Sequence, residues 1–263
     1  MPALDWIRRI AHRKTIAAAL YACIGGAFVI HAVDAIAAPL PERVTFASAD
    51  RRTTLVGYVF TPERPHAART PAVVMMHGRG GVYSSAASGR YDASTLSKRH
   101  RQWAQIWAQQ GYLAILVDGF GPRNYPQGFP KFSYEIRPEA VNEVTIRPLD
   151  AYGALAYLRT RDDVLADRVA LQGWSNGGSA TLAAMANTAP GINSLTPATG
   201  FRIALAFYPA CGLKRKFPDG IRPYAPVWMF HGTADEEVSP PGCAEFAARS
   251  RASGGDVHYA VYP

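Results

Sequence analysis

A serine between two glycines lies in the middle of the chain, in a setting typical of an activated nucleophile. The segment Gly173-Trp174-Ser175-Asn176-Gly177 has the form G-x-S-x-G, with the apolar run RVALQ before it and small residues after it. A strand followed by a helix is the context in which this pattern forms a nucleophile elbow, and the glycines leave room for its cramped turn. We interpret Ser175 as a candidate nucleophile for acyl transfer. The alternative is a serine that caps a helix.

Acyl transfer also needs two N–H donors for the oxyanion of the tetrahedral intermediate. The amide of Asn176, at the start of the expected helix, is the first candidate. The second should come from the glycine-rich loop HGRGG at 77–81, which directly follows the apolar run PAVVMM. We place this donor at Arg79, with Gly80 as the alternative. His77 is expected to brace the loop.

A carboxylate that could orient a catalytic base follows a later apolar run. The segment APVWMFHGTADEEVSP carries Asp235, Glu236 and Glu237 in a tight turn. We choose Asp235 as the catalytic acid, because Val238 and Pro240 mark the start of the next helix. The two glutamates would then lie in the first helical turn, where negative charge suits the helix dipole.

Apolar runs of strand length alternate with helix-like segments along the chain. A mostly parallel sheet with helices on both faces is the expected fold class, α/β, after an antiparallel opening pair. Strands are predicted over 43–49, 54–62, 71–78, 112–120, 168–174, 201–209, 225–232 and 257–263, and helices over 98–111, 148–161, 179–187 and 241–252.

One segment departs from this rhythm. Residues 119–148 are rich in proline, glycine and aromatic residues and connect a strand to a helix. Ligands bind beyond the carboxyl ends of parallel strands, so the part at 119–136 is a candidate wall or lid of a substrate pocket. The alternative is a surface loop. Arg123 and Arg147 could recognise a carboxylate, but arginines in such places more often form structural ion pairs.

The N-terminus has the pattern of an export signal. Basic residues precede the apolar run TIAAALYACIGGAFVIHAV, and Ala35-Ile36-Ala37 fits small-x-small cleavage before Ala38. We expect residues 1–37 to be a signal peptide and 38–263 to be the mature domain, periplasmic or secreted. The alternative is an uncleaved membrane anchor. The basic residues are Arg8, Arg9, Arg13 and Lys14.

Export bears on the cysteines, because an oxidising compartment favours disulfides. Only Cys211 and Cys243 would remain in the mature chain. Both follow expected parallel strands, which would place them at the same edge of the sheet. We therefore expect a disulfide between them. The alternative is two separate buried thiols.

Bulk composition is that of a globular protein: 263 residues, 48% hydrophobic, 18% charged and a net charge of +8. The basic residues are scattered and no nucleic-acid motif is present, so we expect no nucleic-acid partner. We expect no metal site either. A membrane would be contacted only through the N-terminal segment, if that segment stays uncleaved.

The chain resembles the dienelactone hydrolase family of α/β-hydrolases over about residues 43 to 263. HGRGG, GWSNGG and HGTADEEVSP carry the resemblance, and AFYPACG with PPGCAEF is similar to exported bacterial members. The resemblance implies an α/β-hydrolase fold and cofactor-free hydrolysis of carboxylic esters or lactones. Dienelactone hydrolase itself uses a cysteine nucleophile. Ser175 therefore makes a general serine esterase, acting on a small ester or lactone, the expected function.

The histidine of that family follows the last strand, whereas this chain ends at Pro263, where the loop should begin. His77 and His231 are expected to brace loops, and His258 lies within the last strand; His12, His31, His66 and His100 lie elsewhere. We therefore expect the general base and the last helix beyond Pro263. We also expect impaired activity and exposed apolar sheet surface in the chain as given.

Two alternatives to an esterase remain. One is a prolyl-oligopeptidase-like peptidase, which usually carries an additional propeller domain that this chain has no room for. The other is a catalytically inactive hydrolase fold kept as a binding protein.

Overall fold

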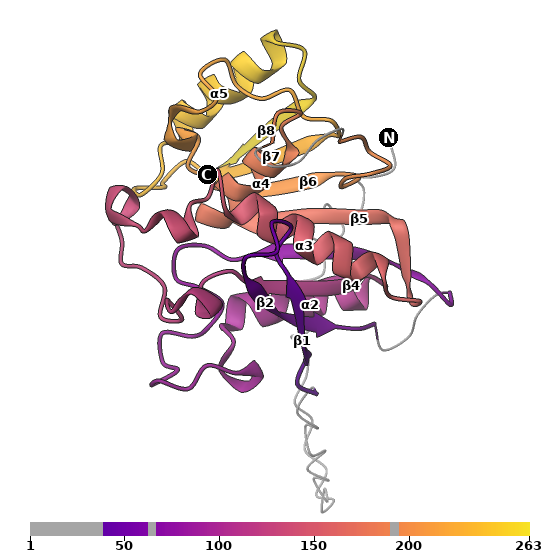
Figure 1. Cartoon of the computed structure of the whole chain (residues 1–263). Helices are drawn as coiled ribbons and strands as arrows, with labels where there is room; N and C mark the ends of the chain where they lie inside the picture. Colours follow the sequence, from indigo (N-terminus) through magenta and orange to yellow (C-terminus); the bar gives the residue numbers. More distant parts are fainter. Residues whose placement is uncertain (1–38, 63–66, 190–194) are drawn as a thin grey trace, which may run out of the picture. The chain divides into compact units, whose positions relative to one another are not determined.

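The computed structural model describes residues 39–62, 67–189 and 195–263 (Figure 1). The expected signal peptide, residues 1–37, lies outside them. An eight-stranded sheet has the order β1-β2-β4-β3-β5-β6-β7-β8. Its strands are β1 (Glu42–Ala47), β2 (Thr54–Phe60), β3 (Thr70–Met76), β4 (Leu113–Asp118), β5 (Val164–Trp174), β6 (Ala204–Phe207), β7 (Val227–Gly232) and β8 (Val257–Tyr262).

The sheet is mostly parallel, as expected. β2 pairs antiparallel with β1 and β4, and all the remaining neighbours pair parallel. Every side chain of β4 is buried, which explains why its sequence, LAILVD, is almost continuously apolar. β5 begins earlier than predicted, at Val164 instead of 168, because its first residues also pair with the start of β3.

Helices cover both faces of the sheet. The α-helices are α2 (Lys98–Gln109), α3 (Arg147–Arg159), α4 (Asn176–Met185) and α5 (Pro240–Ala252). Short 3-10 turns are η1 (Ala93–Thr95), η2 (Gly121–Arg123), η3 (Tyr134–Ile136), η4 (Glu139–Val141) and η5 (Leu213–Arg215). No helix among the described residues is both long and apolar enough to cross a membrane.

α2 packs on one face of the sheet. Trp107 on this helix donates a 2.5 Å hydrogen bond to the Gln172 side chain of β5, and the Trp103 ring lies against Trp174 and Phe207. The helix begins at its N-cap Ser97 and ends before Gly111, whose φ is +83°.

The large core lies on the other face, under α3, α4 and α5. Aliphatic side chains of the central strands pack there against the apolar side of these helices. The cluster includes Val74, Ile115, Leu171, Met229, Leu155, Leu182 and Phe246. In β8, the edge strand of the sheet, Val261 and Tyr262 are 44% and 50% exposed.

The parallel strands all end at one edge of the sheet, and the loops that follow β3, β4, β5, β6 and β7 meet there (Figure 1). This edge carries every candidate site residue. The fold therefore gathers residues from five separate segments of the chain.

Candidate active site

Ser175 stands in a strained turn between β5 and α4. Its φ and ψ are 51° and −118°, in the left-handed half of backbone space that residues with a side chain rarely adopt. Although it occupies the N-cap position of α4, its side chain makes no capping hydrogen bond. Ser175 therefore does not act as a helix cap, and its hydroxyl is left available for chemistry.

The two glycines of the motif are required by close packing around the elbow. A Cβ added at Gly173 would overlap the backbone carbonyl of Gly177, and one added at Gly177 would overlap the carbonyls of Met76 and His77. β5, α4 and the end of β3 are thus in backbone contact. No larger residue fits at either glycine without moving backbone.

The HGRGG loop lies directly beside the elbow. A Cβ added at Gly78 would lie 3.4 Å from the Ser175 Cβ and 3.2 Å from the carbonyl oxygen of Trp174. Arg79 and Gly80 border the same hollow as Ser175. The loop therefore lies next to the serine.

His77 braces this loop, as expected. Its Nδ1 donates to the Gly78 carbonyl at 2.7 Å, and its Nε2 accepts the Gly119 N–H at 3.2 Å. Burial and the nearby Arg147 guanidinium hold the pKa of His77 well below its usual range. The imidazole is therefore neutral and joins the loop after β3 to the loop after β4.

A buried arginine joins the two sides of the elbow. Arg147 Nη1 donates to the His77 carbonyl at 2.7 Å and to Asn176 Oδ1 at 2.6 Å, and Asn176 Nδ2 donates to Glu143 at 3.1 Å. Burial lowers the pKa of Arg147 to about 10, so the group stays charged at neutral pH. Arg147 is therefore a structural residue, not a substrate-binding one.

Arg123 is structural too. Its guanidinium makes two bonds to the buried carboxylate of Asp150, at 2.8 and 2.7 Å, and a third to the Gly119 carbonyl. The expected structural ion pair is confirmed for Arg123, whereas Arg147 is held by hydrogen bonds to the His77 carbonyl and the Asn176 side chain.

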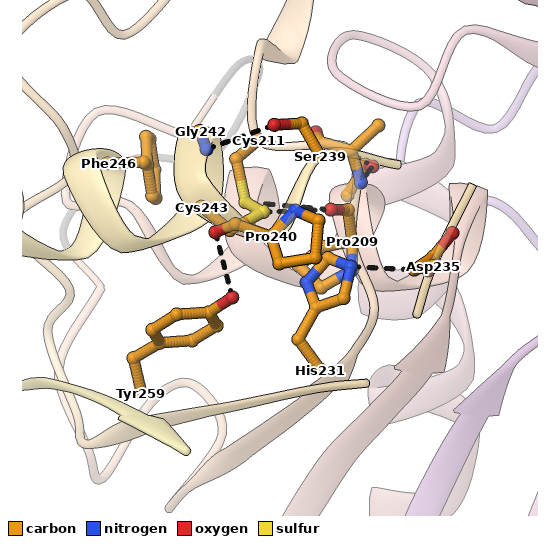
Figure 2. The surroundings of a disulfide bond; sticks show 12 residues. Pro209, Cys211, His231, Asp235, Ser239, Pro240, Gly242, Cys243, Phe246 and Tyr259 are labelled. Atoms are coloured by element: carbon orange, nitrogen blue, oxygen red, sulfur yellow. Dashed lines mark hydrogen bonds and ion pairs between the residues drawn. A yellow bond between two sulfur atoms is a disulfide. The ribbon is translucent and has the colours of Figure 1, made fainter. Parts of the chain in front are cut away.

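Asp235 follows β7 at the same edge of the sheet. Its Oδ1 accepts the N–H groups of Glu237 and Val238, both at 2.9 Å, which fixes the turn. Its Oδ2 lies 3.2 Å from Nε2 of His231, and the two side chains point toward each other in Figure 2. That contact lacks hydrogen-bond geometry. His231 is buried and neither of its ring nitrogens has a hydrogen-bond partner, so its role as a brace of the loop stays a prediction.

The two glutamates after Asp235 are not in a helical turn, so that prediction is wrong. α5 begins only at Pro240, with Ser239 as its N-cap. The Asp235 turn occupies the intervening residues, because its carboxylate holds their backbone N–H groups. Glu237 instead forms an ion pair of 2.7 Å with Arg79.

Two hollows meet at the serine. Ser175 and Glu237 border both of them. Residues 126–131 line the first hollow, and Phe132, Tyr134, Glu135 and Arg137 line the second. The loop over 119–136 therefore forms walls of the candidate site, which agrees with the expected pocket wall and not with the alternative of a plain surface loop.

None of the described histidines is arranged as a base for Ser175. His258 of β8 stacks on Trp228 of β7 and contacts Asp256, and it borders neither hollow. His100 borders the first hollow, but its Nδ1 is bonded to the Val82 carbonyl and burial lowers its pKa to about 4. A base of that strength gives little assistance at neutral pH.

The expected disulfide is present. Cys211, in the loop after β6, is bonded to Cys243 on the first turn of α5, with 5.2 Å between their Cα atoms (Figure 2). The bond joins the loop that borders the second hollow, through Ala210 and Gly212, to the helix that follows the Asp235 turn. Within the described part of the chain, no cluster of three potential metal ligands occurs.

Sequence reasoning missed Glu143 and misjudged Glu237. No motif marks Glu143, which is buried beside Asn176 from a segment without regular structure. Glu237 was visible in the DEE run, but only its pairing with Arg79 shows that it borders the site.

The eight-stranded sheet, the elbow serine and the loops around it define an α/β-hydrolase. The model of the dienelactone hydrolase family matches residues 55–263, and the chain belongs to that family. No curated protein is similar enough in sequence to match it.

Solved structures share the fold at low sequence identity. Esterase 2 of Thermogutta terrifontis is 20% identical, with 85% of this chain and 83% of that chain covered and a TM-score of 0.57. Dipeptidyl peptidase 4 of Porphyromonas gingivalis is 16% identical, with 85% and 32% covered and a TM-score of 0.59. A puromycin-hydrolysing peptidase of Mycobacterium tuberculosis is 18% identical, with 84% and 35% covered and a TM-score of 0.60. This chain spans about a third of the length of these two peptidases.

Proposed function

We propose that this hydrolase cleaves a small carboxylic ester or lactone through an acyl-enzyme on Ser175. The observation that carries the proposal is the left-handed backbone of Ser175, with its hydroxyl uncommitted to the helix and open to two hollows. Oγ attacks the carbonyl carbon while its proton passes to a base. The proton then leaves with the alkoxide as alcohol. Water repeats the sequence on the acyl-enzyme and releases the acid.

In this proposal the amides of Asn176 and Arg79 hold the oxyanion, with Gly80 as the alternative second donor. The N-terminus of α4 adds a favourable dipole at the same point. Each donor contributes about 3 kcal/mol to transition-state binding. Asp235 orients the base through Oδ2, because Oδ1 is already occupied by two backbone N–H groups.

We propose that none of the described histidines is the base that takes the Ser175 proton. The geometry of the described histidines supports this, since both ring nitrogens of His77 are hydrogen-bonded to backbone and His100 is a weak base. Without its histidine a serine triad loses about a millionfold in turnover. We accordingly propose that Ser175 reacts slowly unless a base is added.

We also propose that the protein is exported and works in the periplasm or outside the cell. The bond between Cys211 and Cys243 supports this, because structural disulfides persist in oxidising compartments.

Imidazole rescue tests the function and the missing base together. Hydrolysis of p-nitrophenyl acetate by the full chain should rise with added imidazole, measured as the excess over Ser175→Ala at the same imidazole concentration. The subtraction is needed because imidazole itself cleaves this ester. Equal rates for the two proteins at every concentration would refute the serine mechanism. Fast hydrolysis by the wild type without imidazole, lost in Ser175→Ala, would show that a base is already present.

A further inference from the structure

An ion pair crosses the candidate site. Arg79 Nε donates to Glu237 Oε1 at 2.7 Å, and the two side chains are 23% and 26% exposed. Arg79 is held from a second side as well. Its Nη1 donates to the Phe129 carbonyl at 3.0 Å, and its own carbonyl accepts the Phe129 N–H at 2.8 Å. Three loops, those after β3, β4 and β7, are thereby tied together at one point.

The strand order of the sheet determines where the Arg79–Glu237 ion pair lies. Arg79 follows β3 and Glu237 follows β7, while β5 and β6 lie between those strands. Three strand spacings amount to about 14 Å, which only a long side chain from each loop can bridge. Ser175 stands at the end of β5, inside that gap. The ion pair therefore crosses the sheet edge at the serine.

The two hollows agree with this placement. Ser175 and Glu237 belong to both, Arg79 borders the first, and Val238 borders the second. Aromatic residues line both hollows, and more of them line the first. Three tyrosines and a phenylalanine, Tyr83, Tyr91, Tyr208 and Phe129, border the first hollow. The second has Phe132 and Tyr134, with the Lys214 ammonium over the Tyr134 ring at 4.6 Å.

We propose that the Arg79–Glu237 ion pair is a steric barrier that divides the site into two compartments, one for each side of the scissile ester bond. It determines specificity by excluding acyl groups that are branched next to the carbonyl carbon. Such branches would occupy the space that the two side chains fill beside Ser175. The substrate is accordingly an ester or lactone unbranched at that carbon, with an aromatic group suited to the first compartment. This inference rests on the proposed function.

The test compares two esters that differ only in branching at that carbon, p-nitrophenyl acetate and p-nitrophenyl pivalate, under the imidazole conditions above. Glu237→Ala should raise the ratio of kcat/KM for pivalate over acetate at least tenfold. Glu236→Ala is the matched control, because Glu236 is exposed and borders neither hollow. Its ratio should equal that of the wild type. An unchanged ratio in Glu237→Ala would overturn the proposal.

A second readout does not need turnover. Boronic acids add reversibly to serine hydroxyls, so the affinities of methylboronic and tert-butylboronic acid can be measured by thermal shift. Glu237→Ala should gain affinity for the tert-butyl compound alone. Equal gains in affinity for both compounds, or no gain for either, would contradict the proposed steric barrier. If Ser175-dependent hydrolysis is absent but Glu237→Ala gains affinity for tert-butylboronic acid alone, the proposed function is refuted and the steric barrier is supported.

Discussion

Arg147 Nη1 lies 2.6 Å from the side-chain oxygen of Asn176, the residue directly after Ser175. The same nitrogen lies 2.7 Å from the His77 carbonyl at the start of the HGRGG loop. A fully buried cation thus connects the two backbone segments that carry the proposed oxyanion donors. Its charge is balanced by buried carboxylates, including Asp150 and Glu143.

Arg147→Met should therefore harm both stability and reactivity. The variant leaves the His77 carbonyl and the Asn176 side chain without their donor and removes one countercharge from Asp150. Breaking a buried charge arrangement costs about 3–5 kcal/mol of unfolding free energy. Urea denaturation measures this loss.

Arg123→Met is the matched control for Arg147→Met. It also removes a cation from Asp150 but contacts neither His77 nor Asn176. Both variants should be less stable. Only Arg147→Met should slow imidazole-assisted acylation of Ser175 at a temperature where both proteins are folded. Equal slowing in the two variants would show that Arg147 acts through stability alone.

The elbow glycines make a second prediction. In Gly177→Ala the new methyl group would meet two backbone carbonyls, which cannot swing aside as a side chain can. Overpacking of this kind costs about 1–3 kcal/mol or more, and here it also displaces Ser175. Gly232→Ala is the control, because no atom lies within 4 Å of its added Cβ. Equal urea midpoints for the two variants would mean that the elbow is looser than described.

Much of this arrangement could be predicted from the sequence, for identifiable reasons. The spacing of apolar residues and the length of each apolar run indicated the strands and helices. The G-x-S-x-G pattern indicated the elbow, because glycine is the only residue that the backbone contacts at the elbow allow. The parallel order of β6 and β7 allowed Cys211 and Cys243 to be paired before their positions were known.

Long-range side-chain contacts could not be predicted. Arg79 and Glu237 are far apart in sequence, and nothing local to either residue marks a partner. The error at Glu237 has a local cause. The Asp235 side chain captured the backbone N–H groups that a helix start would have used, which delayed α5 to Pro240.

The disulfide makes a third prediction. Its closed loop is long enough to contribute about 3–4 kcal/mol by the chain-entropy account. Reduction should lower the urea midpoint of the wild type but not that of the double variant Cys211→Ser, Cys243→Ser.

Thiol counting checks the bond directly. The full chain has three cysteines, so the denatured, unreduced protein should show one reactive thiol, Cys23, and the reduced protein three. Three reactive thiols without reductant would show that the bond is absent.

The buried His100 makes stability depend on pH. Burial lowers its folded pKa to about 4, whereas the unfolded residue titrates near its ordinary value of 6.5. As the pH falls below 6.5 the unfolded state takes up the proton first, so stability decreases until the pH reaches about 4 and then levels off. His100→Gln should therefore lose about 2 kcal/mol less than the wild type between pH 7 and pH 5. Urea denaturation at both pH values measures this difference. An equal loss of unfolding free energy in the two proteins would contradict the buried, neutral imidazole.

Covalent labelling of Ser175 tests the central claim most directly. The Thermogutta esterase of the same fold is phosphonylated by cyclosarin, so a fluorophosphonate is a suitable probe. In imidazole, intact mass and peptide mapping should show a single adduct, on Ser175, that is absent from Ser175→Ala. An adduct on another residue, or an unlabelled Ser175 in folded protein, would contradict the account.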